Sequence, residues 1–418
     1  MGGSTFGNRA CVARIDPLFD SPHSMTDPTL DEAPFAAARQ LHDQVLLPLK
    51  RAFVGKDEIV DLLGVCLVAR ENLFLLGPPG TAKSALVREL ARRIDGRVFD
   101  YLLTRFTEPN ELFGPFDIRR LREGDLVTNT EGMLPEADFV FLDELLNANS
   151  AILNSLLMAL NERVFRRGRE TRPLPALMFV GASNRLPEDE SLRALFDRFL
   201  LRASCDNVGD DRLGELLAAG WRLDAGREPA EATVSVDRLR ALQRRVDAIS
   251  LDAVMPRYAE AIIGLRRAGI AVSDRRAVKL QRLVAASALL CGRTVAETTD
   301  LWVLRYIWDT EEQQTIVRDL VDRLLRDAVE AVPESGSRAH PRALERAAFN
   351  AENLAASLRE LSAQAAAAIQ AGDEPCRLRL REAAGSLAAR CQWIENDLQR
   401  SDLQRLIDQV WTQLETGR

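Results

Sequence analysis

A glycine- and proline-rich loop between an apolar run and a helical pattern constrains this chain more than any other feature. The loop reads Gly77-Pro78-Pro79-Gly80-Thr81-Ala82-Lys83-Ser84, and it follows the apolar run Asn72–Leu76. Such a loop points backbone N–H groups at a polyphosphate, and the following helix adds the positive end of its dipole. Lys83 would reach the β- and γ-phosphates, while Ser84 would supply a hydroxyl to Mg²⁺. The alternative, a turn with an unrelated lysine, is disfavoured by the strand–loop–helix context. Ala82 departs from the usual pattern, which has Gly before the Lys.

Apolar runs alternate with helical patterns from Pro34 to about Cys205. The further runs are Val98–Leu103, Phe139–Leu142, Ala176–Val180 and Leu200–Ala203. This alternation is typical of a parallel sheet flanked by helices. The sequence therefore predicts an α/β fold over residues 34–205.

Two further strand ends carry polar side chains. Asp143 and Glu144 follow an apolar strand, so that Asp143 would bind Mg²⁺ and Glu144 would polarise the attacking water. Alone, a strand ending in Asp-Glu is commonplace, and the phosphate loop upstream gives it weight. Asn184 ends the run Ala176–Ser183 and could position water, although an Asn that begins a turn is an equally good interpretation.

The rest of the chain divides at polar breaks. Residues 1–33 have the composition of a flexible segment, and residues 206–235 that of a linker. Residues 236–330 show only helical patterns, which predicts a small helical domain. In residues 331–418, apolar residues recur at spacings of three and four on two stretches, which predicts a hairpin of two long amphipathic helices.

Composition excludes several classes of protein. Lys and Arg number 55 against 62 Asp and Glu, a net charge of −7, which argues against nucleic acid as the partner. No apolar run is long enough to span a membrane, and the first thirty residues lack a signal-peptide core. The six cysteines lie far apart without metal-ligand spacing. We therefore expect a cytoplasmic, soluble protein.

Taken together, these motifs resemble the AAA+ ATPase superfamily. The segments GPPGTAKS, FLDELLNANSAILNSLLMALNER, GASNRLPED and LRALFDRFLLR are similar to its MoxR family, and most similar to the RavA branch. Ala before the loop lysine is usual in that family. The resemblance runs from about Ala52 to Trp308 and implies an αβα sandwich with a helical lid. It does not cover residues 331–418, where RavA-type proteins carry a β-containing insertion.

The resemblance also implies roles for single residues. Val54 and Gly55 resemble the segment that lines the adenine pocket, and Asn184 resembles sensor one. Arg198 resembles the arginine finger that reaches the ATP of a neighbouring subunit, although an Arg near a helix end is often a dipole or salt-bridge partner. Arg275 resembles sensor two, with the adjacent Arg276 as the alternative.

Two further segments have less certain roles. Asp117–Met133 resembles the β-ribbon that this clade inserts after its second helix. Arg163–Arg172 has the pattern of a hairpin in which five of ten residues are Arg. An acidic partner or nucleic acid would explain those arginines, but given the net acidity we favour a solvated hairpin.

The function that follows is ATP hydrolysis with Mg²⁺, coupled to chaperone-like remodelling of a protein partner. The resemblance implies a homo-hexameric ring and a partner with a von Willebrand factor A domain. Two alternatives stay open at this point. One is a nucleotide-dependent binding scaffold with little turnover, and the other is a motor subunit for metal insertion.

Overall fold

The computed structural model describes residues 29–122, 127–167, 170–187, 189–225, 234–330, 340–344, 351–371, 374–391 and 397–416. Its centre is a parallel five-stranded sheet in the order β2-β3-β6-β1-β7. The strands are β1 (Leu73–Leu76), β2 (Val98–Leu102), β3 (Phe139–Asp143), β6 (Met178–Ser183) and β7 (Leu201–Ser204). The predicted parallel sheet is confirmed. Because all five strands run in one direction, the loops after them meet at one edge.

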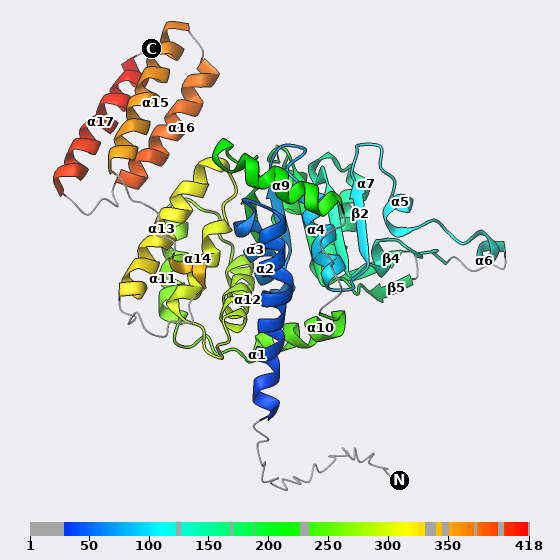
Figure 1. Cartoon of the computed structure of the whole chain (residues 1–418). Coiled ribbons are helices and arrows are strands. Elements are labelled where there is room, and N and C mark those ends of the chain that lie inside the picture. Colours follow the sequence, from blue (N-terminus) through cyan, green and yellow to red (C-terminus); the bar gives the residue numbers. More distant parts are fainter. Residues whose placement is uncertain are drawn as a thin grey trace, which may run out of the picture.

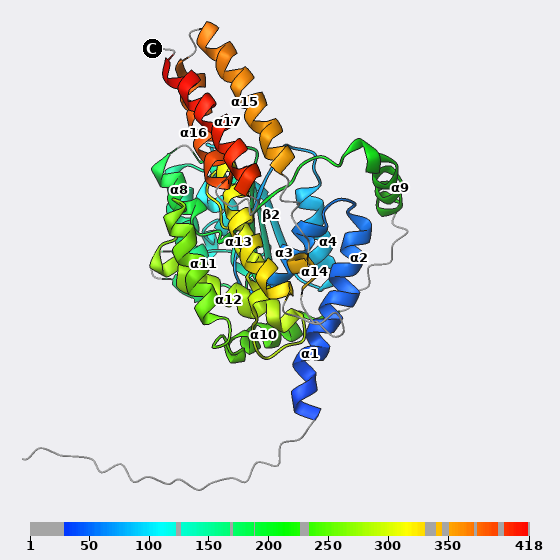
Figure 2. The ribbon, with the colours of Figure 1, turned by 90° about the vertical axis from the view of Figure 1, so that its left-hand side faces the viewer.

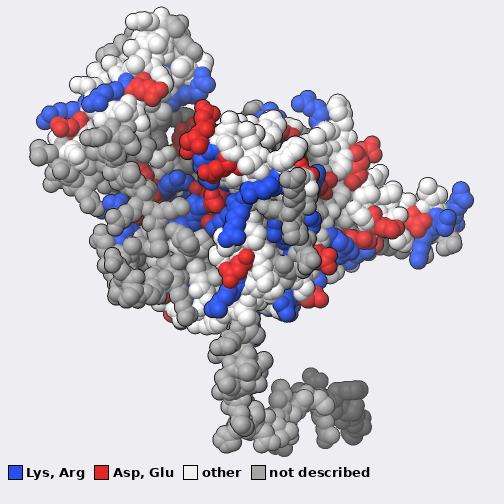
Figure 3. Space-filling view, viewed as in Figure 1, with Lys and Arg blue, Asp and Glu red and all other residues white. Residues whose placement is uncertain are grey.

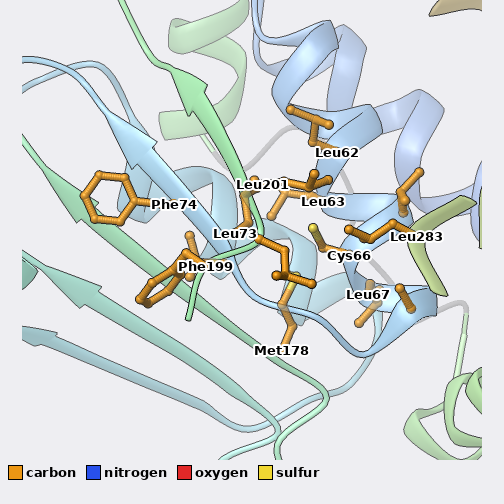
Figure 4. Packing of buried hydrophobic residues seen from close by; sticks show 14 of the residues in the cluster. Leu62, Leu63, Cys66, Leu67, Leu73, Phe74, Met178, Phe199, Leu201 and Leu283 are labelled. Atoms are coloured by element: carbon orange, nitrogen blue, oxygen red, sulfur yellow. The ribbon is translucent and has the colours of Figure 1, made fainter. Parts of the chain in front are cut away.

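Helices cover this sheet and bury its apolar side chains. Before and between the strands lie α1 (Thr29–Leu41), α2 (Leu47–Ala52), α3 (Asp57–Ala69), α4 (Lys83–Arg93), α5 (Pro109–Phe113), α7 (Ser150–Glu162) and α8 (Glu190–Phe196). Helix α3 packs on β1 and β7, and α4 packs on β2 and β3. Figure 4 shows Leu63 and Cys66 of α3 beside Leu73 and Leu201 of the sheet. Strand β1 is buried at every position, which fixes the loop that follows it.

A helical lid follows the sheet domain, as predicted. It consists of α10 (Val236–Arg245), α11 (Met255–Arg267), α12 (Asp274–Leu290), a 3₁₀ helix at Thr298–Tyr306, and α13 (Glu311–Glu330). Helix α12 packs on α3, and α13 packs on the 3₁₀ helix. Within the described part of the chain, no helix has both the length and the apolar character needed to cross a membrane.

A buried charge network joins the lid to strand β7. The Arg202 side chain is fully buried, and its Nη1 lies 2.6 Å from Asp309 Oδ1. Arg276 of α12 donates to the same carboxylate at 3.1 Å and is itself buried. Burial is the main reason that the pKa of Arg202 falls to about 9, and Arg276 lowers it further while Asp309 raises it. One carboxylate therefore pairs with two buried cations from different domains.

Two boundary predictions were wrong. Helix α1 begins at Thr29, so the expected flexible segment ends before residue 33; its residues 1–28 lie outside the described part of the chain. The expected linker 206–235 contains a helix, α9 (Leu213–Asp224). Leu217 and Trp221 of α9 are exposed. The segment therefore lacks the buried stripe by which a helix is usually recognised. Figure 2 shows α9 standing out beside α2.

The last section is helical, as expected, but its long helices are not a pair. Beyond residue 350, the described part of the chain forms three helices, α15 (Ala351–Ala371), α16 (Glu374–Cys391) and α17 (Asp397–Thr416), and each packs on the other two. Their shared core includes Leu361, Leu380 and Val410. The bundle extends beyond α13, away from the sheet (Figure 1). The prediction of a two-helix hairpin is therefore corrected to a three-helix bundle.

A short piece of the expected last section belongs to the lid instead. Helix α14 (Pro341–Leu344) packs on the 3₁₀ helix of the lid. Arg342 donates to Asp61 of α3 at 2.8 Å, and the His340 ring stacks on buried Trp302 with centroids 4.4 Å apart. The boundary predicted at residue 331 therefore lies too early for residues 340–344.

The predicted β-ribbon is an arm with little strand structure. Phe116 and Thr128 form one antiparallel bridge, and the short helix α6 (Ile118–Arg122) lies beyond it. Residues 123–126, in the middle of the segment Asp117–Met133, lie outside the described residues. Figure 1 shows α6 at the end of an arm that leaves the body. In Figure 3 blue side chains gather at its tip, where Arg119, Arg120 and Arg122 lie on α6.

Candidate active site

The loop at residues 77–82 joins the buried end of β1 to the start of α4. Gly77 N donates to Ser183 O of β6 at 3.0 Å, and Cys205 after β7 donates to Leu76 O at 2.6 Å. A β-carbon on Gly77 would overlap the carbonyl of Cys205, so only glycine fits there. Ala82 and Gly80 both have positive φ, of 66° and 84°. The neighbouring strands thus hold the loop in a conformation that turns the chain sharply into α4.

The Lys83 ammonium lies inside this loop. It donates to Gly77 O at 2.9 Å and to Pro78 O at 2.8 Å, and the residue is 7% exposed. Thr81 Oγ1 donates to Pro78 O at 3.0 Å, which fixes the width of the loop. The cation therefore already lies at the centre of the loop, where a phosphate chain would lie.

The two predicted carboxylates lie at the carboxyl end of β3. Asp143 Oδ1 accepts the backbone N–H of Glu144 at 3.0 Å. Glu144 has a φ of 49°, a left-handed conformation that is uncommon outside glycine and that often marks functional positions. Asp143 is partly exposed, and Ser84 at the start of α4 is partly exposed as well. A carboxylate and a hydroxyl are the hard oxygen donors that Mg²⁺ prefers, so their chemistry fits the metal.

The electrostatic surroundings of Glu144 connect it to the loop. Burial raises the pKa of Glu144, and the neighbouring Asp143 raises it further. Lys83 and Arg185 lower it, which places both cations within electrostatic range of this carboxylate. Arg185 also donates to Asn147 at 3.1 Å, and Asn147 donates to Glu144 at 3.4 Å. No motif marks Arg185; its only signal in the sequence is its position beside Asn184.

A cavity of about 710 Å³ opens beside the loop. Asn184, exposed after β6, lines it together with Gly77 and Pro78, so the predicted amide does face the loop. The lid contributes Glu311, Gln314 and Thr315 from the first turns of α13. Sequence reasoning missed these lid residues, because a helix of ordinary composition carries no motif. Ser204 Oγ donates to Gln314 at 3.3 Å and closes this side of the cavity.

The predicted adenine segment lies at the margin of the same cavity. Val54 is buried, and Gly55 has a φ of 74°. A β-carbon on Gly55 would lie 3.2 Å from Val208, and Lys56 donates to the backbone carbonyl of Asp206. Asp206 lines the cavity. Val54 and Gly55 are therefore brought to the cavity edge through the chain that follows β7.

Arg198 lies at the opposite edge of the sheet. Its backbone carbonyl accepts from Asn72, the residue before β1 begins. Its side chain is 22% exposed and contacts Asp197 at 3.3 Å. The Arg198 Nε atom is buried and has no hydrogen-bond partner among the described residues. The described structure therefore does not bring Arg198 to the phosphate loop of its own chain, which follows the carboxyl end of β1.

Arg275 lies at that same starting edge. The exposed Arg275 donates to Asn161, in the last turn of α7, at 3.1 Å. It also lowers the pKa of Glu71, which precedes β1, although burial keeps that pKa raised. The alternative residue, Arg276, is held in the buried network with Asp309. Of the two, only Arg275 has a side chain at the surface.

Most described arginines of the predicted hairpin have partners within the chain. The hairpin is confirmed as β4 (Val164–Arg167) and β5 (Glu170–Pro173), with residues 168 and 169 outside the described part. Arg163 donates to Asn72 at 2.7 Å, and burial lowers its pKa to about 10. Arg167 donates to Gly114 O at 2.5 Å, and Arg172 donates to Thr130 at 2.8 Å. These side chains fasten the hairpin to the sheet and to the base of the arm.

Two family models match this chain, and together they cover the sheet domain and the lid. Residues 39–244 match a model described as the MoxR domain in the MoxR-vWA-beta-propeller ternary systems. Residues 257–321 match the model of an AAA lid domain. The two matches fall on the sheet domain with α10 and on the lid.

Individual proteins agree with these matches. An uncharacterised protein from Methanocaldococcus jannaschii is 37% identical over 275 residues, which covers 65% of this chain and 71% of the relative. The chaperone MoxR1 of Mycobacterium tuberculosis is 27% identical over 49% of this chain and 55% of its own length. A crystal structure of a Cytophaga hutchinsonii protein, provisionally assigned as an ATPase, superposes with a TM-score of 0.58. At 18% identity over 72% of this chain and 98% of that protein, it shows a shared fold.

Proposed function

The chain belongs to the MoxR family of AAA+ ATPases, and from this premise we propose that it hydrolyses ATP to remodel a protein partner. The observation that carries the proposal is that Lys83, in the loop after β1, and the carboxylates Asp143 and Glu144, which follow β3, lie at the same edge of the parallel sheet. Phosphoryl transfer needs a cation on the phosphates, a carboxylate for Mg²⁺ and a group that orients water. The RavA branch and a cytoplasmic location remain part of this proposal.

Each residue has a defined task in this mechanism. The backbone N–H groups of residues 77–82 and the start of α4 bind the phosphate chain. Lys83 would exchange its loop carbonyls for phosphate oxygens, while Ser84 and Asp143 would hold Mg²⁺. Glu144 accepts hydrogen bonds from the attacking water and orients it towards the γ-phosphate. Asn184 faces the cavity from the neighbouring strand and holds that water from a second side.

The cations expected to stabilise the transition state come from a neighbouring subunit in this proposal. Arg198 and Arg275 both lie at the edge where β1 begins, away from the phosphate loop of their own chain. A head-to-tail ring, which we propose to be a hexamer, would place that edge against the cavity of the next subunit. A heterologous interface that closes on itself produces such a ring.

The partner is proposed to carry a von Willebrand factor A domain. The matched family model describes MoxR domains from systems that contain such a protein. A Glu144→Gln chain would hold ATP without turnover and keep any ATP-state partner bound. Recovery of a von Willebrand factor A protein with this variant, and not with Lys83→Ala, supports the partner; its absence from both counts against it.

Two substitutions separate binding from chemistry. Lys83→Ala removes the charge on the phosphates, so we expect labelled ATP to lose affinity by at least about tenfold. Glu144→Gln keeps the size of the side chain but cannot act as a base, so binding should persist while phosphate release falls to background. Equilibrium binding and steady-state phosphate release measure both. Normal turnover by Glu144→Gln would remove this site from the reaction.

A further inference from the structure

A second cavity, lined by arginines, lies at the edge of the sheet where the strands begin. Its volume is about 590 Å³. Arg70 enters it from the end of α3, Arg240 and Arg244 from α10, and Arg282 from α12. Proline and leucine residues of the segment 173–177, which leads into β6, form an apolar wall. Neither Arg198 nor Arg275 lines this cavity, although both lie at the same edge of the sheet.

The charges around this cavity are unbalanced. Arg282 is paired with Asp247 and also donates to Ala69 O at 2.8 Å. Arg240 is paired with Asp138 at 2.9 Å. Arg70 and Arg244 are exposed, and neither guanidinium has a hydrogen-bond or ion-pair partner among the residues that the structure describes. Two positive charges of the lining therefore remain without a counter-ion from the described protein.

Arg70 occupies a position that ordinarily favours glycine. It caps α3 with a φ of 57° and a ψ of 37°, and its N–H bonds to Cys66 O and Leu67 O. Glycine or asparagine is usual at such a left-handed cap, because a larger side chain is strained there. Burial and the nearby Arg282 and Arg240 lower the pKa of Arg70, so the cations repel one another across the cavity. An arginine under strain and repulsion is the pattern expected of a ligand-binding position.

A purely structural explanation covers only part of this arrangement. Basic residues are favoured at helix C-termini by the helix dipole, and both Arg70 and Arg244 lie at such ends. However, the carbonyls there already have donors, since Gln243 donates to Leu67 O at 2.7 Å and Arg282 donates to Gln243 O at 3.1 Å. The dipole also gives no reason for three helices to direct arginines into one hollow.

We propose that this arginine cavity binds a small molecule that carries a pyrophosphate group. Guanidinium groups match phosphate oxygens two at a time, which makes arginine the usual residue for such anions. The volume falls in the range of small-molecule sites, whereas an acidic peptide would need an extended groove. The ligand would bridge α3 of the sheet domain and α10 and α12 beyond it, and so tie the lid to the sheet. The binding does not depend on ATP turnover.

Inorganic pyrophosphate is the probe that tests this proposal. Titration calorimetry is performed without Mg²⁺ on the full chain carrying Lys83→Ala, so that the phosphate loop does not contribute. We expect saturable binding. Adding Arg70→Gly or Arg244→Gln should weaken it about tenfold or more, since each removes a charge-assisted contact. Glycine suits the left-handed cap, so Arg70→Gly should fold at least as stably as its parent.

Arg245→Gln is the matched control, because Arg245 is exposed on the same turn of α10 and does not line the cavity. Its affinity should stay within about twofold of the parent, as expected for a charge that makes no direct contact. Absence of saturable binding would overturn the proposal. An equal loss in Arg245→Gln would also overturn it, because surface charge alone would then explain the binding. So would an acidic peptide that competes as well as pyrophosphate at equal charge.

Discussion

The Asp309 carboxylate is the single side chain on which the junction of sheet and lid depends most. It is shared by Arg202, which is fully buried, and by Arg276, which is nearly so. Without the Asp309 carboxylate, the buried Arg202 guanidinium loses its ion pair and the main attraction that holds its pKa up. The cost of desolvation then has no compensation.

We predict that Asp309→Ala lowers the free energy of unfolding by about 3–5 kcal/mol, the usual effect of leaving a buried charge without its partner. Glu260→Ala is the control, because Glu260 belongs to an exposed pair with Arg257 on α11 and should cost at most about 1 kcal/mol. Urea unfolding of the full chain measures both. Equal, small effects would show that the Asp309 network does not stabilise the fold.

His340 makes the stability depend on pH. Its pKa is lowered to about 4, mainly by burial; Asp61 opposes this shift, while Lys50 and Arg342 add to it. An unfolded chain carries histidine with a pKa of about 6.5. As the pH falls below that value the unfolded state gains a proton that the folded state does not. Stability is therefore complete above about pH 6.5 and is lost as the pH falls towards 4.

By pH 5 this loss amounts to about 2 kcal/mol for His340. A His340→Gln chain cannot titrate there, so its unfolding free energy should fall less between pH 7 and pH 5 by that amount. Urea unfolding at the two pH values compares the variant with the parent, and the other histidines are common to both. The same pH dependence in both chains would show that His340 is not the group responsible.

Helix α14 belongs with the lid, whereas the three-helix bundle contacts the lid mainly where α16 packs on α13 among the described residues. Arg342 of α14 pairs with buried Asp61, and its carbonyl accepts from Arg305. The bundle has its own small cores. A truncation that keeps α14 and one that removes it should therefore have different effects.

We predict that removal of the bundle after Asn350 leaves basal ATPase activity and the melting temperature close to those of the full chain. Removal after Pro333 takes α14 as well, so it should lower the melting temperature by several degrees, because Asp61 loses one of its partners. Thermal unfolding and phosphate release test both truncations. Loss of ATPase activity in the longer truncation would make the bundle part of the motor.

The sequence predicts the elements whose buried residues form a regular apolar pattern. All five strands of the sheet are apolar runs, and each was expected within about two residues of its observed position. Helix α9 was missed because Gly214 and Gly220 interrupt its pattern and give the segment the composition of a linker. The bundle was predicted as two helices because the apolar positions from Leu380 onward were interpreted as one continuous helix, whereas α16 ends at Cys391 and α17 begins at Asp397. An apolar pattern indicates which face of a helix is buried, but not where that helix ends.

The site was predictable in part for the same physical reason. The phosphate loop, the two carboxylates and the amide each follow an apolar strand. Parallel strands bring these carboxyl ends to the same edge of the sheet. Arg185 and Glu311 carry no pattern, and only the fold brings them near the loop. The pattern also does not say on which edge Arg275 lies, because that depends on how α12 packs on α3.

The proposed catalytic site is complete only when two chains meet. The phosphate loop and its carboxylates lie at one edge of the sheet, while Arg198 and Arg275 lie at the other. A cation supplied by a neighbour stabilises charge that grows only in the transition state. Such a finger contributes roughly a thousandfold or more to turnover, whereas a surface salt bridge would contribute nothing to catalysis.

Mixing two inactive subunits tests this claim most directly. Arg198→Ala chains should bind ATP normally and hydrolyse it poorly, and Lys83→Ala chains should bind none while keeping their arginine. In co-assembled mixtures the second chain supplies the finger that the first lacks, so phosphate release should rise well above the sum of the separate activities. Absence of any rise, in mixtures shown to co-assemble, would contradict a site completed between neighbours.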